Sequence, residues 1–263
     1  MRAPVNSEAH GVTLDCIELT DCFEGLKNVP DGSVDLIASD PPYGTTDNDW
    51  DTLPNFEKLF AEFRRVLKPT GTVVFTCVFP FAAKLIVDNA DIFKYDMVWE
   101  KNRKTDFANA KNKPLRRHEN ILVFSKGTCA NRSLRRMAYN PQGLEECKIA
   151  HKAKVTRSPN YGKALNTAYT QTQKNYPDTV LEFPCVQRTV HPTQKPEELF
   201  EWIIRTYSDE GDTVLDPFVG SGTTAVCAKR LGRHYVGFEM DAKYHAIACA
   251  RLGECAVAST EAA

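Results

Sequence analysis

The segment of residues 212–239 constrains the fold of this 263-residue chain more than any other. Residues 212–216 form a short β-favouring run, residues 217–224 form a glycine-rich turn, and residues 235–239 form a second run that ends in an acid. Between the turn and the second run, apolar residues recur at helical spacing. Strand, turn, helix and strand in this order predict a βαβ unit, which requires a parallel sheet.

The rest of the chain alternates in the same way. The pattern predicts further strands at residues 12–17, 34–39, 72–77, 95–100 and 119–125. It predicts helices at residues 22–28, 56–67, 82–89 and 241–252, and one more that begins at Pro196. We therefore predict an α/β fold, a doubly wound and mostly parallel sheet with helices on both faces.

Three regions lack this pattern. Residues 44–53 are polar and predict a mobile surface loop, and residues 101–117 are basic and predict another loop. From 127 to 190 the periodicity fades, which indicates an insertion whose fold the pattern does not show. We therefore assign residues 1–126 and 191–263 to one core domain and residues 127–190 to the insertion.

Composition limits the class of protein. The chain is 42% hydrophobic and 25% charged, as in globular proteins, and no apolar run approaches the roughly 18 residues of a membrane span. Its nine cysteines include no C-x-x-C pair, and its start shows no secretory signal. We expect reduced thiols, no metal site and a cytoplasmic location.

The charge is unevenly distributed. The whole chain has a formal net charge of −1, but residues 101–174 contain 17 lysines and arginines against 4 aspartates and glutamates. A strongly basic segment on an acidic protein favours a polyanion partner over a merely solvated loop region.

A rigid loop that carries an acid follows the strand predicted at residues 34–39. Its sequence is Asp40-Pro41-Pro42-Tyr43. Prolines have a fixed φ and no N–H, so the loop presents bare carbonyls from a stiff backbone. A carboxylate, a rigid carbonyl and an aromatic face suit a planar group that carries –NH2. A turn with a capping aspartate and a packed tyrosine explains the same four residues equally well.

The glycine-rich turn indicates a nucleotide site. Glu239 follows Gly220 by 19 residues, near the spacing at which an acid accepts hydrogen bonds from ribose hydroxyls. The turn lacks the complete G-x-G-x-x-G pattern of dinucleotide sites and begins with Asp216. Because that acid would repel a pyrophosphate but pair with an amino group, the turn favours S-adenosylmethionine over a nicotinamide cofactor.

With both motifs in view, the chain resembles the amino-methylating DNA methyltransferases, in the group whose catalytic motif precedes the cofactor motif. The resemblance rests on these segments: Asp40-Pro41-Pro42-Tyr43, the turn at 216–224, His191 to Pro196, Leu19-Thr20-Asp21-Cys22, Trp99-Glu100-Lys101 and His118-Glu119-Asn120. The matches span residues 19–125 and 191–252. The chain departs from the pattern at Thr20, where the family usually has glycine.

The resemblance implies roles for the first loop. The Asp40 carboxylate and the Pro41 carbonyl would hold an exocyclic amino group, with Pro42 completing the catalytic loop. The Tyr43 ring would stack on a base that has been flipped out of a DNA duplex.

It also implies a binding site for S-adenosylmethionine. The implied contacts are Asp21, Asp216, Pro217, Phe218, Gly220, Ser221, Gly222, Thr223, Glu239 and Lys195. Within this set, Glu239 would bind the ribose and Asp21 the adenine ring. A helix-capping turn explains Lys195 about as well as cofactor binding does.

The implied reaction is methylation of an amino group in double-stranded DNA, with the insertion recognising the target. Aspartate at the head of the loop favours N6 of adenine over N4 of cytosine in this family. Other hypotheses are methylation of RNA or of a protein glutamine, a catalytically silent DNA-binding module, and a nicotinamide oxidoreductase. The sequence does not distinguish a monomer from a homodimer and does not show the recognition site.

Overall fold

The structure, a computed structural model, describes residues 13–44, 53–131, 133–158, 162–166 and 168–261. It divides into two compact units. The larger comprises Met1–Asn140 and Thr179–Ala263, and the smaller comprises Pro141–Asp178. The smaller unit lies inside the range assigned to the insertion, whereas residues 127–140 and 179–190 belong to the larger unit.

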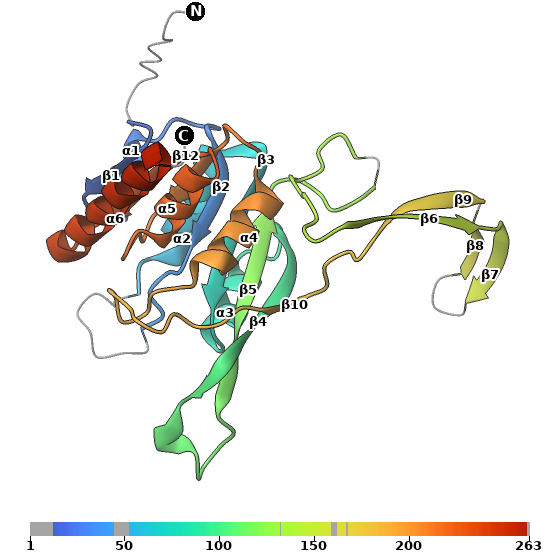
Figure 1. Ribbon diagram of the computed structural model, residues 1–263, viewed down its shortest axis with the longest axis horizontal. Coiled ribbons are helices and arrows are strands. Elements are labelled where there is room, and N and C mark those ends of the chain that lie inside the picture. Colours follow the sequence, from blue (N-terminus) through green and yellow to red (C-terminus); the bar gives the residue numbers. More distant parts are fainter. Residues whose placement is uncertain (1–12, 45–52, 132, 159–161, 167, 262–263) are drawn as a thin grey trace, which may run out of the picture. The chain divides into compact units, whose positions relative to one another are not determined.

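An eight-stranded sheet forms the centre of the larger unit (Figure 1). Its strands are β1 (Cys16–Leu19), β2 (Val34–Ser39), β3 (Leu67–Cys77), β4 (Phe93–Thr105), β5 (Arg116–Ser125), β10 (Val180–Glu182), β11 (Thr213–Asp216) and β12 (His234–Glu239). In space they follow the order β1-β12-β11-β2-β3-β5-β4-β10. All neighbours are parallel except at β5, which runs antiparallel to both β3 and β4. The predicted α/β fold with a mostly parallel sheet is confirmed.

Helices cover both faces of this sheet. They are α1 (Cys22–Asn28), α2 (Phe56–Val66), α3 (Phe81–Asp88), α4 (Glu197–Tyr207), α5 (Thr223–Arg230) and α6 (Ala242–Glu261). Side chains of β2 alternate between the two faces. Ile37 packs in a cluster with α1, α2 and α3, whereas Leu36 and Ala38 pack with α4, α5 and α6. Among the described residues, no helix has the length and apolar character that a membrane span requires.

The predicted helix at residues 56–67 shows how the local sequence forms these elements. Phe56, Leu59, Phe60 and Phe63 are buried on one face of α2, at the spacing of successive helical turns. The Asn55 side chain caps the first turn by accepting a backbone hydrogen bond at 3.0 Å. Burial of each such side chain contributes about 1.5–3 kcal/mol, so packing against the sheet holds this helix in place.

The parallel arrangement brings several chain segments to one edge of the sheet. The strands β2, β11 and β12 are parallel neighbours, so their carboxyl ends meet there. Asp40 directly follows β2, whereas Asp216 and Glu239 are the last residues of β11 and β12. The antiparallel strand β5 begins near this edge, where β4 also passes.

Residues 101–117 form a hairpin instead of the predicted loop. The strand β4 continues to Thr105 and β5 begins at Arg116, with a 3₁₀ turn, η1 (Phe107–Asn109), between them. Both strands are polar here, so no apolar alternation marks them in the sequence, and cross-strand backbone pairing forms the ribbon. The predicted loop at 44–53 falls largely on residues 45–52, which lie outside the described residues.

The smaller unit consists of two antiparallel ribbons. In one, β6 (Glu145–His151) pairs with β9 (Tyr169–Lys174). In the other, β7 (Lys154–Ser158) pairs with β8 (Gly162–Asn166). The short strand β10, in the range assigned to the insertion, instead extends the large sheet beside β4.

Candidate active site

A cavity of about 780 Å³ opens at the carboxyl edge of the sheet. This volume lies in the range of roughly 300–1,000 Å³ that small-molecule sites occupy. The predicted site residues that line it are Asp21, Asp40, Pro41, Pro42, Tyr43, Lys195, Asp216, Pro217, Phe218, Gly220, Ser221, Thr223 and Glu239. The fold therefore brings the Asp-Pro-Pro-Tyr loop and the glycine-rich turn to one cavity. Gly222 is not among its lining residues.

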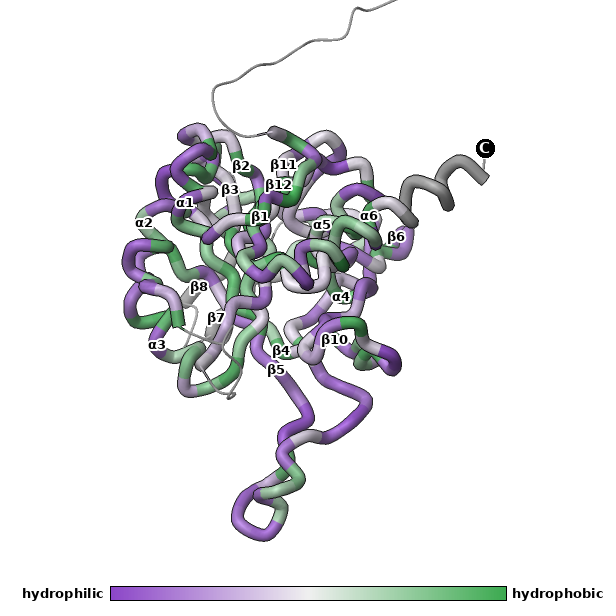
Figure 2. The backbone as a smooth tube through the Cα atoms, turned by 90° about the vertical axis from the view of Figure 1, so that its left-hand side faces the viewer, coloured by the Kyte–Doolittle hydropathy of each residue, from purple (hydrophilic) through white to green (hydrophobic). Residues whose placement is uncertain are grey.

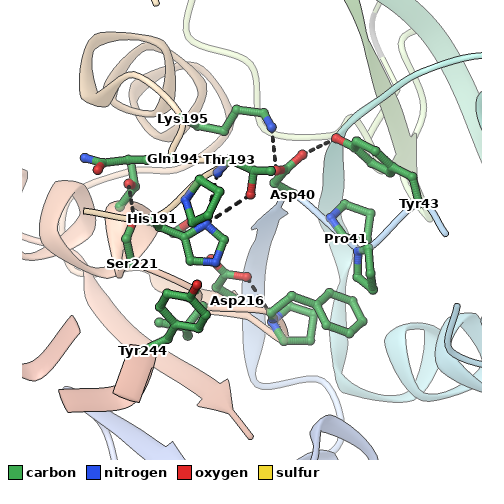
Figure 3. Close-up of a pocket in the computed structure, with 18 of the residues that line it drawn as sticks. Asp40, Pro41, Tyr43, His191, Thr193, Gln194, Lys195, Asp216, Ser221 and Tyr244 are labelled. Atoms are coloured by element: carbon green, nitrogen blue, oxygen red, sulfur yellow. Dashed lines mark hydrogen bonds and ion pairs between the residues drawn. The ribbon is translucent and has the colours of Figure 1, made fainter. Parts of the chain in front are cut away.

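The Asp40 carboxylate accepts hydrogen bonds from three side chains, two of which, Tyr43 and Lys195, are shown in Figure 3. Its Oδ1 accepts hydrogen bonds from the Tyr43 hydroxyl and from Thr76 Oγ1, the latter at 2.6 Å. Its Oδ2 accepts one from Lys195 Nζ. A carboxylate oxygen has two acceptor positions, so these contacts fill Oδ1 and leave one acceptor position on Oδ2.

Four buried charges form a cluster around Asp40. Lys195 Nζ also lies 3.5 Å from Glu119 Oε2, and Lys101 Nζ donates to Glu119 Oε1 at 3.0 Å. The four side chains are between 6% and 17% exposed, and the cluster balances two ammonium groups against two carboxylates. Burial raises the pKa of Asp40, which Lys195 partly counteracts. Burial opposes ionisation of Glu119 as well, but Lys195 and Lys101 together lower its pKa.

The Tyr43 ring stands beside the carboxylate that it contacts. Besides Asp40, its hydroxyl donates to the Thr76 carbonyl at 3.1 Å. The ring packs against Phe81 with centroids 5.6 Å apart, and Lys195 Nζ lies 5.9 Å from its centroid. These contacts fix an aromatic face at the wall of the cavity.

At the glycine-rich turn, Asp216 is almost completely buried. Its Oδ1 accepts hydrogen bonds from Ser39 Oγ at 2.5 Å and from the Phe218 N–H at 3.0 Å. Burial raises the pKa of Asp216 to about 6, although these donors favour the ionised form. A cationic ligand in the cavity would therefore find a carboxylate that is ionised at neutral pH.

The Glu239 carboxylate closes the turn from the neighbouring strand. It accepts hydrogen bonds from the Gly220 N–H at 2.7 Å and from the Asp241 N–H at 2.8 Å. Gly220 has a φ of +52°, and the atom nearest to an added Cβ would be His191 Nε2 at 3.8 Å. An added side chain would therefore touch the His191 ring, and the positive φ itself favours glycine at this position.

Gly222 has a packing position instead of the expected place around the cofactor. It caps α5 with a φ of +82°, and an added Cβ would come within 2.9 Å of the Ala248 Cβ on α6. The absence of a side chain here lets α5 and α6 approach each other.

Asp21 and Lys195 line the cavity and also bond to other residues. Asp21 lines the cavity and also caps α1, where its carboxylate accepts the Phe23 N–H at 2.8 Å. Lys195 was expected near the cofactor, and its ammonium group binds Asp40 of the Asp-Pro-Pro-Tyr loop. Glu119 and Lys101 were not predicted as site residues. Both belong to segments that resemble the family, Trp99-Glu100-Lys101 and His118-Glu119-Asn120, and this resemblance could have indicated them.

His191 is a further residue of the cavity wall that was not predicted. Its ring packs against Tyr244 with centroids 4.2 Å apart, and its Nδ1 accepts the Thr193 N–H at 3.2 Å (Figure 3). Burial lowers the pKa of His191, and the positive charge of Lys195 adds to this effect. We therefore treat His191 as a neutral ring. The described residues contain no group of three or more acidic, histidine or cysteine side chains that could hold a metal ion.

Comparison with known proteins identifies the family. The family described as DNA methylase (N6_N4_Mtase) matches residues 34–250. The chain is 32% identical to the Type II methyltransferase M.HpaI of Haemophilus parainfluenzae, over 89% of this chain and 72% of that protein. It is 29% identical to the Type II methyltransferase M.HinfI of Haemophilus influenzae, over 92% of this chain and 69% of that protein. The chain belongs to the DNA methylase family.

Solved structures agree with this assignment. The M1.HpyAVI–SAM complex is 25% identical, with a TM-score of 0.57 over 90% of this chain and 98% of that one. The PvuII DNA methyltransferase, described as cytosine-N4-specific, shares the fold at 19% identity, with a TM-score of 0.62 over 92% of this chain and 87% of that one. The resemblance stated from the motifs is confirmed, and the protein is a DNA methyltransferase that uses S-adenosylmethionine.

The cavity of this methyltransferase fits that cofactor. Five carboxylates line it: Asp40 and Glu119 belong to the charge cluster, whereas Asp21, Asp216 and Glu239 lie outside that cluster. Acids suit a ligand that carries a sulfonium and an ammonium group, whereas they would repel a pyrophosphate. Gly220 lines the cavity without a side chain, and Glu239 ends the neighbouring strand where ribose hydroxyls are bound in related folds.

Proposed function

We propose that this methyltransferase modifies the N6 amino group of adenine in double-stranded DNA. The observation that carries the proposal is the Asp40 carboxylate, paired with Lys195 at the wall of the cavity with one acceptor position free on Oδ2. Aspartate at this position favours adenine in the family that the motifs resemble.

The catalytic loop would clamp the amino group. Oδ2 of Asp40 and the Pro41 carbonyl would accept its two N–H bonds, and this draws the nitrogen away from the planar geometry in which its lone pair is delocalised into the ring. Pro42 keeps the loop stiff because its φ is fixed. The Tyr43 ring would stack on the flipped base and offset part of the few kcal/mol that flipping costs.

The other wall of the cavity would hold S-adenosylmethionine, which supplies an electrophilic methyl group when it is bound. Asp216 would pair with its ammonium group, Glu239 would accept from its ribose hydroxyls, and Asp21 would contact its adenine ring. The backbone of the turn at 217–223 would surround its methionine part. With both ligands in one cavity, positioning can supply much of the rate.

Target recognition belongs in this proposal to residues 127–190. The basic side chains between Lys101 and Lys174 would hold phosphates, and base-edge contacts from residues 127–190 would set the recognised sequence.

A direct assay tests the proposal. The protein is incubated with isotopically labelled S-adenosylmethionine and unmodified duplex DNA, and the DNA is then digested to nucleosides for mass spectrometry. We expect the wild type to yield labelled N6-methyldeoxyadenosine. The Asp40→Ala variant should yield no labelled nucleoside. Recovery of N4-methylcytosine, or of no methylated base, would overturn the adenine assignment. If Asp40→Ala leaves both DNA binding and the biological effect unchanged, the chain acts as a binding module.

A further inference from the structure

The β4–β5 hairpin leaves the sheet as a separate arm, defined here as residues 102–117 (Figure 1). The strand β10 pairs with β4 only as far as Glu100, and β3 pairs with β5 only from Asn120 onward. Among the described strands, those of the arm therefore pair only with each other. A two-stranded ribbon is marginally stable in water, so fold stability does not account for an arm of this length.

The arm is strongly basic. It contains six lysines and arginines and one acid, Asp106. Asp106 pairs with Lys113 at 2.6 Å, and Arg117 pairs with Glu100 at 2.8 Å. Four basic side chains form no ion pair with any described residue: Arg103, Lys104, Lys111 and Arg116. Figure 2 shows this part of the chain as hydrophilic along most of its length. Exposed cations without partners are suited to phosphates.

The root of the arm is part of the active-site cavity. Lys101, Arg103 and Thr105 line that cavity. Their alternate spacing places them on one face of β4. Arg116, directly opposite Thr105 in the ladder, also lines the cavity. When the base of a nucleotide reaches Asp40, the phosphates of that nucleotide must therefore lie near Arg103 and Arg116.

The far end of the arm presents an aromatic side chain. Phe107, in the η1 turn, is 66% exposed. The turn around it is ordered, because Asp106 bonds to Asn109 at 2.7 Å as well as to Lys113. One exposed apolar residue is ordinary on a protein surface. At the end of a basic arm that starts at a base-binding cavity, however, an aromatic ring is placed to make an apolar contact with bases in a groove.

We propose that this arm is a DNA clamp that lies outside the target-recognition region. Arg103 and Arg116 at its root bind the phosphates on either side of the flipped nucleotide, and Phe107 at its end packs against a base in a groove. The root contacts are independent of sequence, since phosphates carry no sequence information. The inference rests on the proposed function, because it requires a flipped nucleotide in the cavity.

Salt-dependent binding tests the root. The probe is a fluorescently labelled DNA duplex of random sequence, and anisotropy is measured between about 50 and 200 mM salt. The double variant Arg103→Gln/Arg116→Gln should reduce the slope of log K against log salt by about 1.8, or roughly 0.9 for each lost phosphate contact. The control Lys27→Gln/Arg205→Gln removes the same charge from the last turns of α1 and α4. Equal slopes for the two double variants would refute the root contacts.

A second pair of variants tests the end of the arm. Phe107→Ala should weaken binding about tenfold with an unchanged salt slope, because the lost contact is apolar and full burial of such a side chain contributes roughly 1.5–3 kcal/mol. Val87→Ala, at a 75% exposed position on α3, should bind like the wild type. Identical affinities for Phe107→Ala and Val87→Ala would refute the aromatic contact.

Nucleoside analysis of the same DNA separates the two proposals. If the wild type produces N4-methylcytosine while the arm variants lose affinity as expected, the adenine assignment fails and the clamp stands. If the wild type produces N6-methyladenine while all variants bind alike, the clamp fails alone. Thermal unfolding of each variant checks that it folds; the substituted side chains are exposed except Arg116, which is half-buried.

Discussion

At the scale of single residues, the charge on Asp40 depends on one lysine. Lys195 is the cation that bonds directly to Asp40, and it lies between Asp40 and Glu119. Both carboxylates favour its protonated form, and they raise the pKa of Lys195 despite its burial. Without this ammonium group, two buried carboxylates would face each other, and one of them would take up a proton near neutral pH.

Lys195→Met removes the charge while it preserves much of the side-chain volume. We expect the pKa of Asp40 to rise, so that kcat falls about 100-fold at neutral pH and recovers as the pH increases. The free energy of unfolding should fall by about 3 kcal/mol, because a buried pair is broken. A pH profile of kcat, with urea unfolding in parallel, measures both effects.

Lys195→Arg provides the control, since it keeps the charge. Its pH profile should stay close to that of the wild type even if positioning lowers its rate. If kcat of Lys195→Met falls at the same low pH as kcat of the wild type, Lys195 does not control the ionisation of Asp40.

Asp216 should make cofactor binding dependent on pH. Burial raises its pKa to about 6 in the free protein. The ammonium group of S-adenosylmethionine favours the ionised carboxylate, so below this pKa binding must first remove a proton. The affinity should be highest near pH 7, between the pKa of Asp216 and that of the cofactor's amino group, and fall about tenfold per pH unit below the pKa of Asp216.

Calorimetric titration across this pH range measures the effect. Asp216→Asn should bind weakly, with a flatter pH dependence than the wild type. Any pH dependence of affinity that remains in this variant would come from Glu239, because burial raises the pKa of Glu239 as well. A wild-type dissociation constant that does not change as the pH falls through this range would refute the pairing with Asp216.

At the scale of secondary-structure elements, the glycine-rich turn depends on the contact between α5 and α6. Gly222 combines a left-handed backbone with a close approach to Ala248. Gly222→Ala should therefore cost about 1–2 kcal/mol for the backbone and a further 1–3 kcal/mol for the steric clash. We expect weaker cofactor binding as well, because α5 begins directly after the turn.

Gly211→Ala is a matched comparison. Gly211 has a φ of +85°, but an added Cβ would meet no atom within 4 Å. This variant should show the backbone cost alone, so the difference in urea unfolding between the two variants isolates the clash with α6. Equal losses of stability would mean that α6 yields to the added methyl group.

At the scale of the whole molecule, the residues that line the cavity all belong to the larger unit. Replacing Pro141–Asp178 with a flexible glycine–serine linker should therefore leave the dissociation constant for S-adenosylmethionine unchanged. Because we assign target recognition to the removed region, methylation of DNA at specific sites should be lost. Calorimetry and nucleoside mass spectrometry measure the two properties. A cofactor affinity more than about tenfold weaker would contradict this division of roles.

The sequence alone determined the class of fold and the residue types of the site. Apolar runs at periods of two and 3.6 residues follow directly from burial of one side of a strand or helix, so the core elements could be predicted. The prolines after residue 40 and the glycines after residue 219 reveal backbone constraints that are local. The site residues named from these motifs line one cavity, apart from Gly222.

Tertiary structure decided the features that depend on contacts between distant residues. The partner of Lys195 is Asp40, 155 positions away, and no local pattern encodes that choice. Glu119 joins the cluster only because the antiparallel β5 begins near the carboxyl edge of the parallel strands. The basic arm of residues 102–117 was also hidden, since cross-strand hydrogen bonds form its ribbon and exposed polar side chains leave no apolar period to read.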